Sequence, residues 1–191
     1  MALEPSVAVF DACILYPFHL RNIAVQAAVD RLVEARWTDA IHDEWIRSLT
    51  TDVPAIPIER LQITRRLMND ALPAAMVRGY EEHIPTVTLP DPDDRHVVAA
   101  AIAAKASLIL TWNLRHFPEN ELKKFGLRKM NPDEFLSELF DEVPDLVIGS
   151  LANARRNLSK TRVAASDFIA ILKEQKLVQL AKRVEKYTSD L

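Results

Sequence analysis

Three aspartates lie within four positions of the segment LPDPDDRHVVAAAIAA, residues 89–104. Asp91, Asp93 and Asp94 precede a run of alanine and valine that predicts a buried helix. Capping is the simplest interpretation, because an N-cap aspartate stabilises a helix by about 1 kcal/mol and Pro92 suits the first helical position. Asp91 would then accept a hydrogen bond from the backbone N–H of Asp94. Capping explains one or two of these carboxylates, and a bound metal ion is the competing interpretation.

Asp11 is harder to explain by capping. It directly follows SVAVF, residues 6–10, an apolar run that predicts a buried strand. A buried carboxylate without a partner is costly, and a cation would offset that cost. A second such run, SLILT at residues 107–111, is followed two positions later by Asn113. Because ligand sites in open parallel sheets form beyond the carboxyl ends of the strands, we expect Asp11 and Asn113 at the same edge.

These residues indicate a donor set made of oxygen atoms. Asp11 and Asp94 supply two carboxylates, Glu44 in AIHDEWIRSL supplies another from a separate helix, and Asp91 is an outer candidate. Carboxylates without His or Cys favour Mg²⁺ or Mn²⁺ over zinc. Without a metal they would repel one another and raise one another's pKa. A site of this kind suits hydrolysis of phosphodiester bonds, in which the ion activates water.

The composition narrows the classes of protein that need to be considered. A chain of 191 residues with 49 % hydrophobic content is long enough for one α/β domain and a modest extension. No apolar run approaches the roughly 20 residues of a membrane span, and Glu4 stands where a secretory signal carries Lys or Arg. We therefore expect a soluble, cytoplasmic protein without a membrane partner. The single Cys13 excludes an internal disulfide, and no glycine-rich nucleotide loop is present.

Charge is distributed unevenly along the chain. Residues 1–148 hold 15 basic and 23 acidic side chains, whereas residues 149–191 hold nine and four. A basic helical segment can contact nucleic acid or an acidic partner, and a solvated helix face is an equally good interpretation. The candidates for phosphate contacts in this segment are Arg155, Arg156, Lys160 and Arg162.

The order of apolar patterns predicts an α/β fold. Weaker strand candidates are TVTL at 86–89 and LRKM at 127–130, and helical periods occur at 21–36 and 58–72. Asn131 and Glu134 form a capping box that begins another helix. Strands separated by helices predict a mainly parallel central sheet with helices on both faces. We place a boundary near residue 141, which gives a domain at 1–140 and a helical C-terminal extension at 141–191.

Four blocks of the sequence resemble the PIN-domain family, in particular VapC-type toxins of bacterial toxin–antitoxin pairs. The blocks are VAVFDACILYP, AIHDEWIRSL, LPDPDDRHVVAAAIAAKASLILTWN and NLRHFP, and their order and spacing match the family over about residues 7–135. The resemblance implies a PIN-like three-layer α/β/α fold and a metal-dependent endoribonuclease. Asp11, Glu44 and Asp94 match its acidic positions, Asn113 stands where many members carry a fourth acid, and Thr111 matches the hydroxyl residue that often accompanies that position.

The resemblance also implies partners. These are Mg²⁺ or Mn²⁺, an RNA substrate, a cognate VapB-type antitoxin that inserts a basic side chain among the carboxylates, and a second copy in a homodimer. Cys13 departs from the family, which usually shows Asn or Ser there, and this puts a hydrogen bond to Asp11 in question. For His96 and His116 contact with phosphate or water near the site is one interpretation, and a surface or helix-packing role is the favoured one.

Two other functions compete with the nuclease interpretation. One is a PIN-like module with little or no catalysis that binds RNA or protein, which Asn113 and Cys13 favour. The other is a phosphatase of the haloacid dehalogenase type, which is disfavoured because that family has an aspartate where Cys13 stands. Trp37, Trp45 and Trp112 are interpreted as packing residues, with a base-stacking role left open for Trp112.

Overall fold

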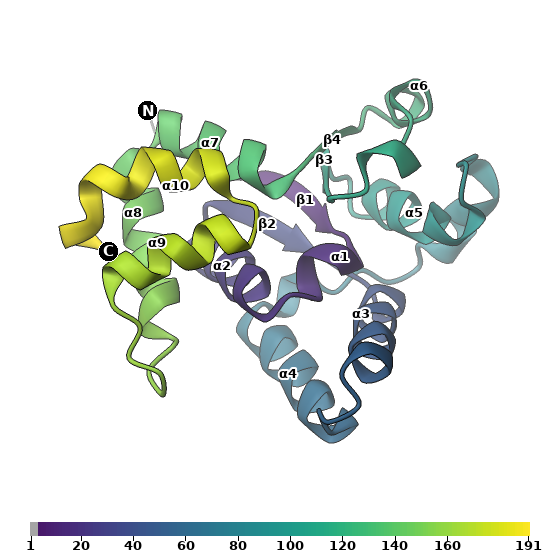
Figure 1. Ribbon diagram of the computed structural model, residues 1–191. Helices are drawn as coiled ribbons and strands as arrows, with labels where there is room; N and C mark the ends of the chain where they lie inside the picture. The colour runs from purple at the N-terminus through teal and green to yellow at the C-terminus, as the bar shows by residue number, and fades with distance from the viewer. Residues whose placement is uncertain (1–3) are drawn as a thin grey trace.

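A four-stranded parallel sheet forms the centre of the protein (Figure 1). The computed structural model describes residues 4–191. The strands are β1 (Ser6–Phe10), β2 (Val33–Arg36), β3 (Leu108–Leu110) and β4 (Arg128–Met130), in the order β2-β1-β3-β4. Ala8 of β1 lies opposite Ala35 of β2 and Leu108 of β3. Residues 108–110 are all buried, as expected of a central strand in a sheet that is covered on both faces.

Helices cover both faces of the sheet, so the predicted three-layer α/β/α architecture is confirmed. The helices up to β4 are α1 (Ala12–Leu15), α2 (Phe18–Val29), α3 (Asp39–Asp52), α4 (Ile58–Ala71), α5 (Arg95–Ala103) and α6 (Glu119–Leu122). Short 3-10 turns span Pro73–Ala75, Glu81–Thr86, Pro92–Asp94, Leu114–His116 and Lys123–Phe125. The chain passes from β1 to β2 in one direction and returns across β1 to β3. Because parallel crossovers are right-handed, this reversal places α2 and α5 on opposite faces.

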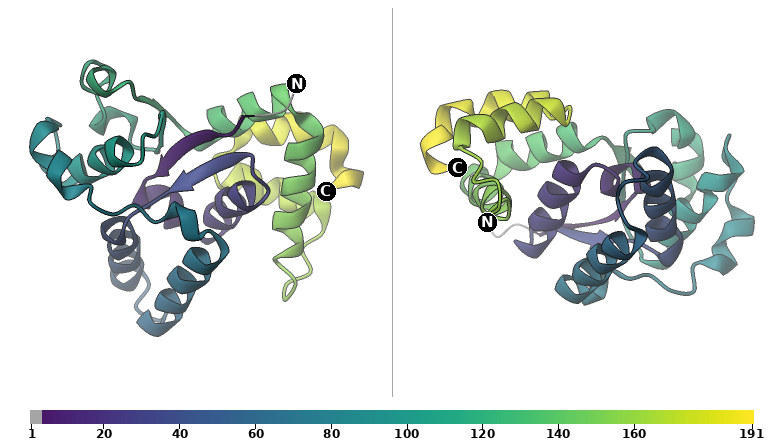
Figure 2. Two further views of the ribbon diagram at one scale, coloured as in Figure 1. Left: turned by 180° about the vertical axis from the view of Figure 1, so that it is seen from behind. Right: turned by 60° about the horizontal axis from the view of Figure 1, so that its bottom comes forward.

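The C-terminal segment is helical, as predicted, and packs against the sheet domain (Figure 2). It consists of α7 (Pro132–Glu142), α8 (Pro144–Arg156), α9 (Ala165–Glu174), α10 (Val178–Val184) and a terminal 3-10 turn (Glu185–Asp190). A polar seam joins α8 to α2: the side-chain amide of Asn157 donates to Oδ1 of Asn22 at 3.1 Å and to Oε1 of Gln26 at 2.9 Å. Asn22 in turn donates to the carbonyl of Ala154 at 2.7 Å. Within residues 4–191, no helix is both long and apolar enough to cross a membrane.

The predicted helix at 21–36 is wrong in its second half. The helix ends at Val29, Arg31 adopts a left-handed conformation with φ of 61°, and Val33–Arg36 forms β2. Val33 and Ala35 are buried while Glu34 is exposed, so these residues satisfy a strand period as well as a helical one. Pairing with β1 decided between the two.

The predicted strand at 86–89 is also wrong. Thr86 ends a 3-10 turn, and residues 87–89 run in irregular conformation although Val87 and Leu89 are buried. Pro85 and Pro90 flank the segment, and proline cannot donate to a strand ladder. The other strand predictions, the helix at 58–72 and the capping box of Asn131 and Glu134 are confirmed to within a residue or two.

Candidate active site

Asp11 lies at the carboxyl end of β1 and is 2 % exposed. It is the N-cap of α1, where its Oδ1 accepts a 2.7 Å hydrogen bond from the N–H of Ala12. Its Oδ2 accepts from the hydroxyl of Thr111 at 2.6 Å and from Sγ of Cys13 at 3.2 Å. Burial raises the pKa of Asp11, these hydrogen bonds lower it, and the negative charge of Glu44 raises it.

Thr111 and Cys13 connect the ends of β3 and β1. The hydroxyl oxygen of Thr111 also accepts from the N–H of Asn113 at 2.9 Å. Sγ of Cys13 accepts from the N–H of Trp112 at 3.3 Å, and burial raises the pKa of the Cys13 thiol to about 12. Cys13 is therefore a protonated donor to Asp11, so the hydrogen bond that its departure from the family put in question is present.

Asp94 does not cap α5, although it occupies the N-cap position. Asp91 is the capping residue: its Oδ1 accepts from the N–H of Asp93 at 2.9 Å, not from Asp94 as predicted. The difference arises because Pro92–Asp94 forms a tight 3-10 turn and the α-helix begins at Arg95. Asp93 is exposed. The Asp94 carboxylate therefore remains available for another role.

Two histidines face the acidic residues, although the sequence favoured packing or surface roles for them. Nδ1 of His116 lies 2.7 Å from Oδ2 of Asp94, and Nε2 of His96 lies 3.4 Å from Oε2 of Glu44. Burial raises the pKa of Asp94, the hydrogen bond from His116 lowers it, and the charges of Asp91 and Glu44 raise it. The sequence position of His116 could have indicated this contact, because His116 belongs to the turn that directly follows Asn113.

The donor set fits a divalent cation. Ligand atoms of Asp91, Asp94 and His116 all lie within 4.8 Å of one another. The negative charge of Glu44 raises the pKa of both Asp11 and Asp94, so its carboxylate lies within electrostatic reach of each. A bound cation would reduce the repulsion among these carboxylates and offset the energetic cost of burying the negative charge of Asp11. The imidazole widens the range of suitable ions from Mg²⁺ toward Mn²⁺ and other transition metals.

The four basic residues predicted to contact phosphate lie on the end of α8 and the loop after it. Arg155 donates to the carbonyl of Val163 at 2.8 Å, and Arg156 donates to Oδ1 of Asn153 at 2.5 Å. Lys160 and Arg162 are exposed. Figures 1 and 2 show this loop extending from the molecule on the side away from α5 and α6. The structure therefore brings the acidic residues together but keeps these four basic residues apart from them.

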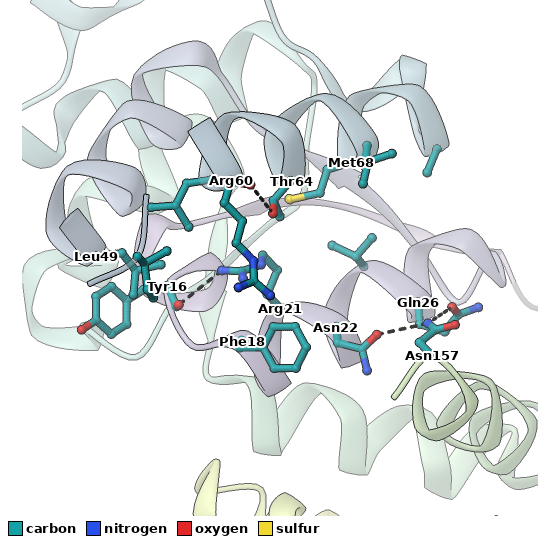
Figure 3. A pocket seen from close by; sticks show the side chains of 15 residues that line it. Tyr16, Phe18, Arg21, Asn22, Gln26, Leu49, Arg60, Thr64, Met68 and Asn157 are labelled. Atoms are coloured by element: carbon teal, nitrogen blue, oxygen red, sulfur yellow. Dashed lines mark hydrogen bonds between the residues drawn. The ribbon is translucent and has the colours of Figure 1, made fainter. Parts of the chain in front are cut away.

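A groove of about 830 Å³ lies between α2 and α4, beside α1 (Figure 3). Its lining is mainly apolar and includes Phe18, Leu67 and Met68, of which Phe18 and Leu67 are 59 % and 63 % exposed. Arg21 forms part of the wall, where its guanidinium donates to the carbonyls of Leu15 and Tyr16. The groove reaches Tyr16, which ends the short helix that directly follows Asp11.

Comparisons with known proteins match two parts of the chain. The family model described as PIN domain covers residues 7–115, and the model described as VapC50 C-terminal domain covers residues 132–186. A curated protein of Mycobacterium tuberculosis (strain ATCC 25618 / H37Rv), "Putative ribonuclease VapC50", is 35 % identical over 88 residues, which are 44 % of this chain and 52 % of the relative. The chain thus spans about half the length of this relative. No solved structure matches significantly.

Proposed function

The chain belongs to the PIN-domain family, and from this premise we propose that it is a metal-dependent endoribonuclease. The observation that carries the proposal is the arrangement around Asp11. Its buried carboxylate accepts a hydrogen bond from Thr111. The negative charge of Glu44 raises the pKa of both Asp11 and Asp94. The curated relative named as a ribonuclease supports the same activity. Asp11, Glu44 and Asp94 would hold Mg²⁺ or Mn²⁺, with Asp91 at the margin.

A divalent ion, when bound, supplies activation of water and neutralisation of phosphate charge. The protein's own residues supply the positioning. Thr111 and Cys13 fix the orientation of the Asp11 carboxylate through hydrogen bonds to Oδ2. Asn113 is exposed and its backbone N–H donates to Thr111; in this proposal its side chain would supply an uncharged amide at the edge of the site. An amide can donate to a phosphate oxygen without adding to the repulsion.

We propose that this nuclease is the toxin of a toxin–antitoxin pair that acts on RNA in the cytoplasm. The matches to a PIN domain and a VapC50 C-terminal domain support this role. The partner would be a VapB-type antitoxin that places an Arg among the carboxylates, because a guanidinium can form paired hydrogen bonds there. The apolar groove beside α1 would receive the neighbouring part of the same antitoxin segment. We also propose that the protein forms a homodimer and that its nuclease domain ends at residue 140, where the helical C-terminal extension begins.

Cleavage of a mixed RNA pool tests the proposed activity. The assay compares Mn²⁺, Mg²⁺ and EDTA, with the wild type, Asp11→Asn, Asp94→Asn and Asp93→Asn. Asp93 is the matched control, because it is adjacent to Asp94 and exposed. We expect cleavage that requires metal, a loss of at least about 100-fold in the first two variants, which corresponds to roughly 2.7 kcal/mol of barrier, and no loss in Asp93→Asn. Equal activity of Asp93→Asn and Asp94→Asn would refute the assignment.

The second candidate function is a PIN-like module that binds RNA or protein with little or no catalysis. Asn113 favours it, because an amide cannot supply the charge of a fourth acid. Metal binding measured by calorimetry, combined with intact RNA in the cleavage assay, would select this function. In that case Asn113→Asp is the informative variant, since added cleavage would show that the missing charge limits the reaction.

A further inference from the structure

The loop between α9 and α10 brings a basic side chain to Trp112, the residue that directly follows Thr111 of the candidate active site. Nζ of Lys176 lies 5.9 Å from the ring centroid of Trp112. The backbone N–H of Trp112 donates to Sγ of Cys13 at 3.3 Å, and Cys13 donates to Asp11 at 3.2 Å. Trp112 therefore connects the C-terminal extension directly to the hydrogen-bond network of Asp11.

Packing holds this loop in place. Leu177, the residue after Lys176, is fully buried. At the start of α10 the carboxylate of Asp133 accepts from the N–H groups of Gln179 and Leu180, each at 2.9 Å. Asp133 belongs to α7, the helix that follows β4. The position of Lys176 relative to the sheet edge is thus set by buried contacts and not by a free tail.

The charge of Lys176 is available for a ligand. Its side chain is exposed, and no carboxylate within residues 4–191 lies at ion-pair distance from it. Lys173, three residues earlier on α9, is instead paired with Glu185. Trp112 is half-buried, whereas Trp37 and Trp45 are completely buried. Among the three tryptophans, Trp112 alone is partly exposed to solvent.

We propose that Lys176 and Trp112 bind the RNA strand where it leaves the acidic site, the ammonium group on a backbone phosphate and the exposed part of the indole on a base. This inference rests on the proposed nuclease function and assigns a substrate contact to the C-terminal extension. The negative charge of an acidic site repels the phosphate backbone of an approaching RNA strand. The positive charge of Lys176 would offset this repulsion where the strand leaves the site. Proteins that bind single strands combine basic side chains with aromatic surfaces in this way.

The test measures binding of a single-stranded RNA oligonucleotide by fluorescence anisotropy at 50–200 mM salt, in Ca²⁺, with RNA integrity checked on a gel. Lys176 has a φ of 64°, and asparagine tolerates that conformation, so Lys176→Asn removes the charge without a backbone cost. Lys176→Arg retains the charge. Lys182→Gln is the matched control, because Lys182 is an exposed lysine on α10 with no ion pair within the described chain.

We expect Lys176→Asn to lose RNA affinity while the two comparison variants keep it. The slope of log affinity against log salt should fall by about 0.7, the value for one phosphate of a single strand, so that the deficit shrinks by about 2.6-fold between 50 and 200 mM. Lys176→Arg and Lys182→Gln should retain the wild-type slope. RNA should quench tryptophan fluorescence through Trp112, and Trp112→Leu should abolish the quenching.

Three outcomes would overturn the inference: no RNA binding by the wild type, equal slopes for Lys176→Asn and the wild type, or equal losses in Lys176→Asn and Lys182→Gln. Unchanged RNA binding with weakened binding of the antitoxin would assign the pair to a protein partner instead. Cleavage is scored separately in Mn²⁺. A wild type that binds RNA through Lys176 but never cleaves it contradicts the nuclease function and leaves the Lys176 assignment standing.

Discussion

The hydroxyl of Thr111 donates a 2.6 Å hydrogen bond to Oδ2 of Asp11, and this contact joins the carboxyl ends of β3 and β1. The same oxygen accepts from the N–H of Asn113. Thr111 thus acts with Ala12 and Cys13 to orient the buried carboxylate, and it also fixes the backbone at the start of the next turn.

Thr111→Val should weaken metal binding and lower stability. Valine has nearly the shape of threonine but cannot donate, so Oδ2 of Asp11 loses its shortest hydrogen bond, and a buried acceptor left without its partner costs about 1–3 kcal/mol. Denaturant unfolding and calorimetry with Mn²⁺ measure the two effects. Thr111→Ser keeps the hydroxyl and should retain most of both properties. Unchanged metal affinity in Thr111→Val would show that Thr111 does not position Asp11.

Asp133→Ala should loosen the attachment of α10. The Asp133 carboxylate serves α10 as an N-cap contributed by another helix, because it accepts from the N–H groups of Gln179 and Leu180. Alanine has no side-chain acceptor, and loss of such a cap costs about 1 kcal/mol. Amide hydrogen exchange should show faster exchange in α10 with little change in β1. Glu138→Gln is the control, since Glu138 is exposed on the same helix, and similar exchange in both variants would contradict the capping role.

Leu67→Asp should reduce association with the antitoxin without reducing metal-dependent cleavage. Leu67 lines the groove and is 63 % exposed, so the substitution leaves the core intact and places a charge where an apolar surface is expected to dock. Ile63→Asp provides the comparison, because Ile63 is 47 % exposed on the same helix but does not line the groove. Co-purification of each variant with the co-expressed partner is the measurement. Equal retention of the partner by both variants would place its binding elsewhere.

Stability should fall as the pH decreases from about 6.5 to about 4, in part through His42. Burial lowers the pKa of His42 from 6.5 to about 4. Nδ1 of His42 accepts from the indole N–H of Trp45 at 3.0 Å, so the native ring is neutral. In this range the unfolded chain binds a proton that the folded chain does not, and stability therefore decreases with decreasing pH. Urea unfolding at several pH values measures the slope, and His42→Gln should have a shallower one.

Local pattern predicted much of the scaffold. The apolar runs that became β1 and β3 are short and rich in Val, Ile and Leu, as buried strands of a parallel sheet are. The capping box of Asn131 and Glu134 is also local. The hydrophobic pattern gave the wrong element at Val33–Arg36, where the residues fit both a helical and a strand period. It also failed at residues 86–89, where Pro85 and Pro90 prevent strand pairing.

The sequence by itself determined the chemical type of the candidate site. Aspartate after a buried strand and aspartates before a buried helix indicate an oxygen-rich, cation-binding edge whatever the details of packing. Only the tertiary structure decided that the capping residue Asp91 accepts from Asp93 and not from Asp94, that Asp94 faces His116, and that Lys176 reaches Trp112. The contacts of His116 with Asp94 and of Lys176 with Trp112 join residues far apart in the chain, so no local period encodes them.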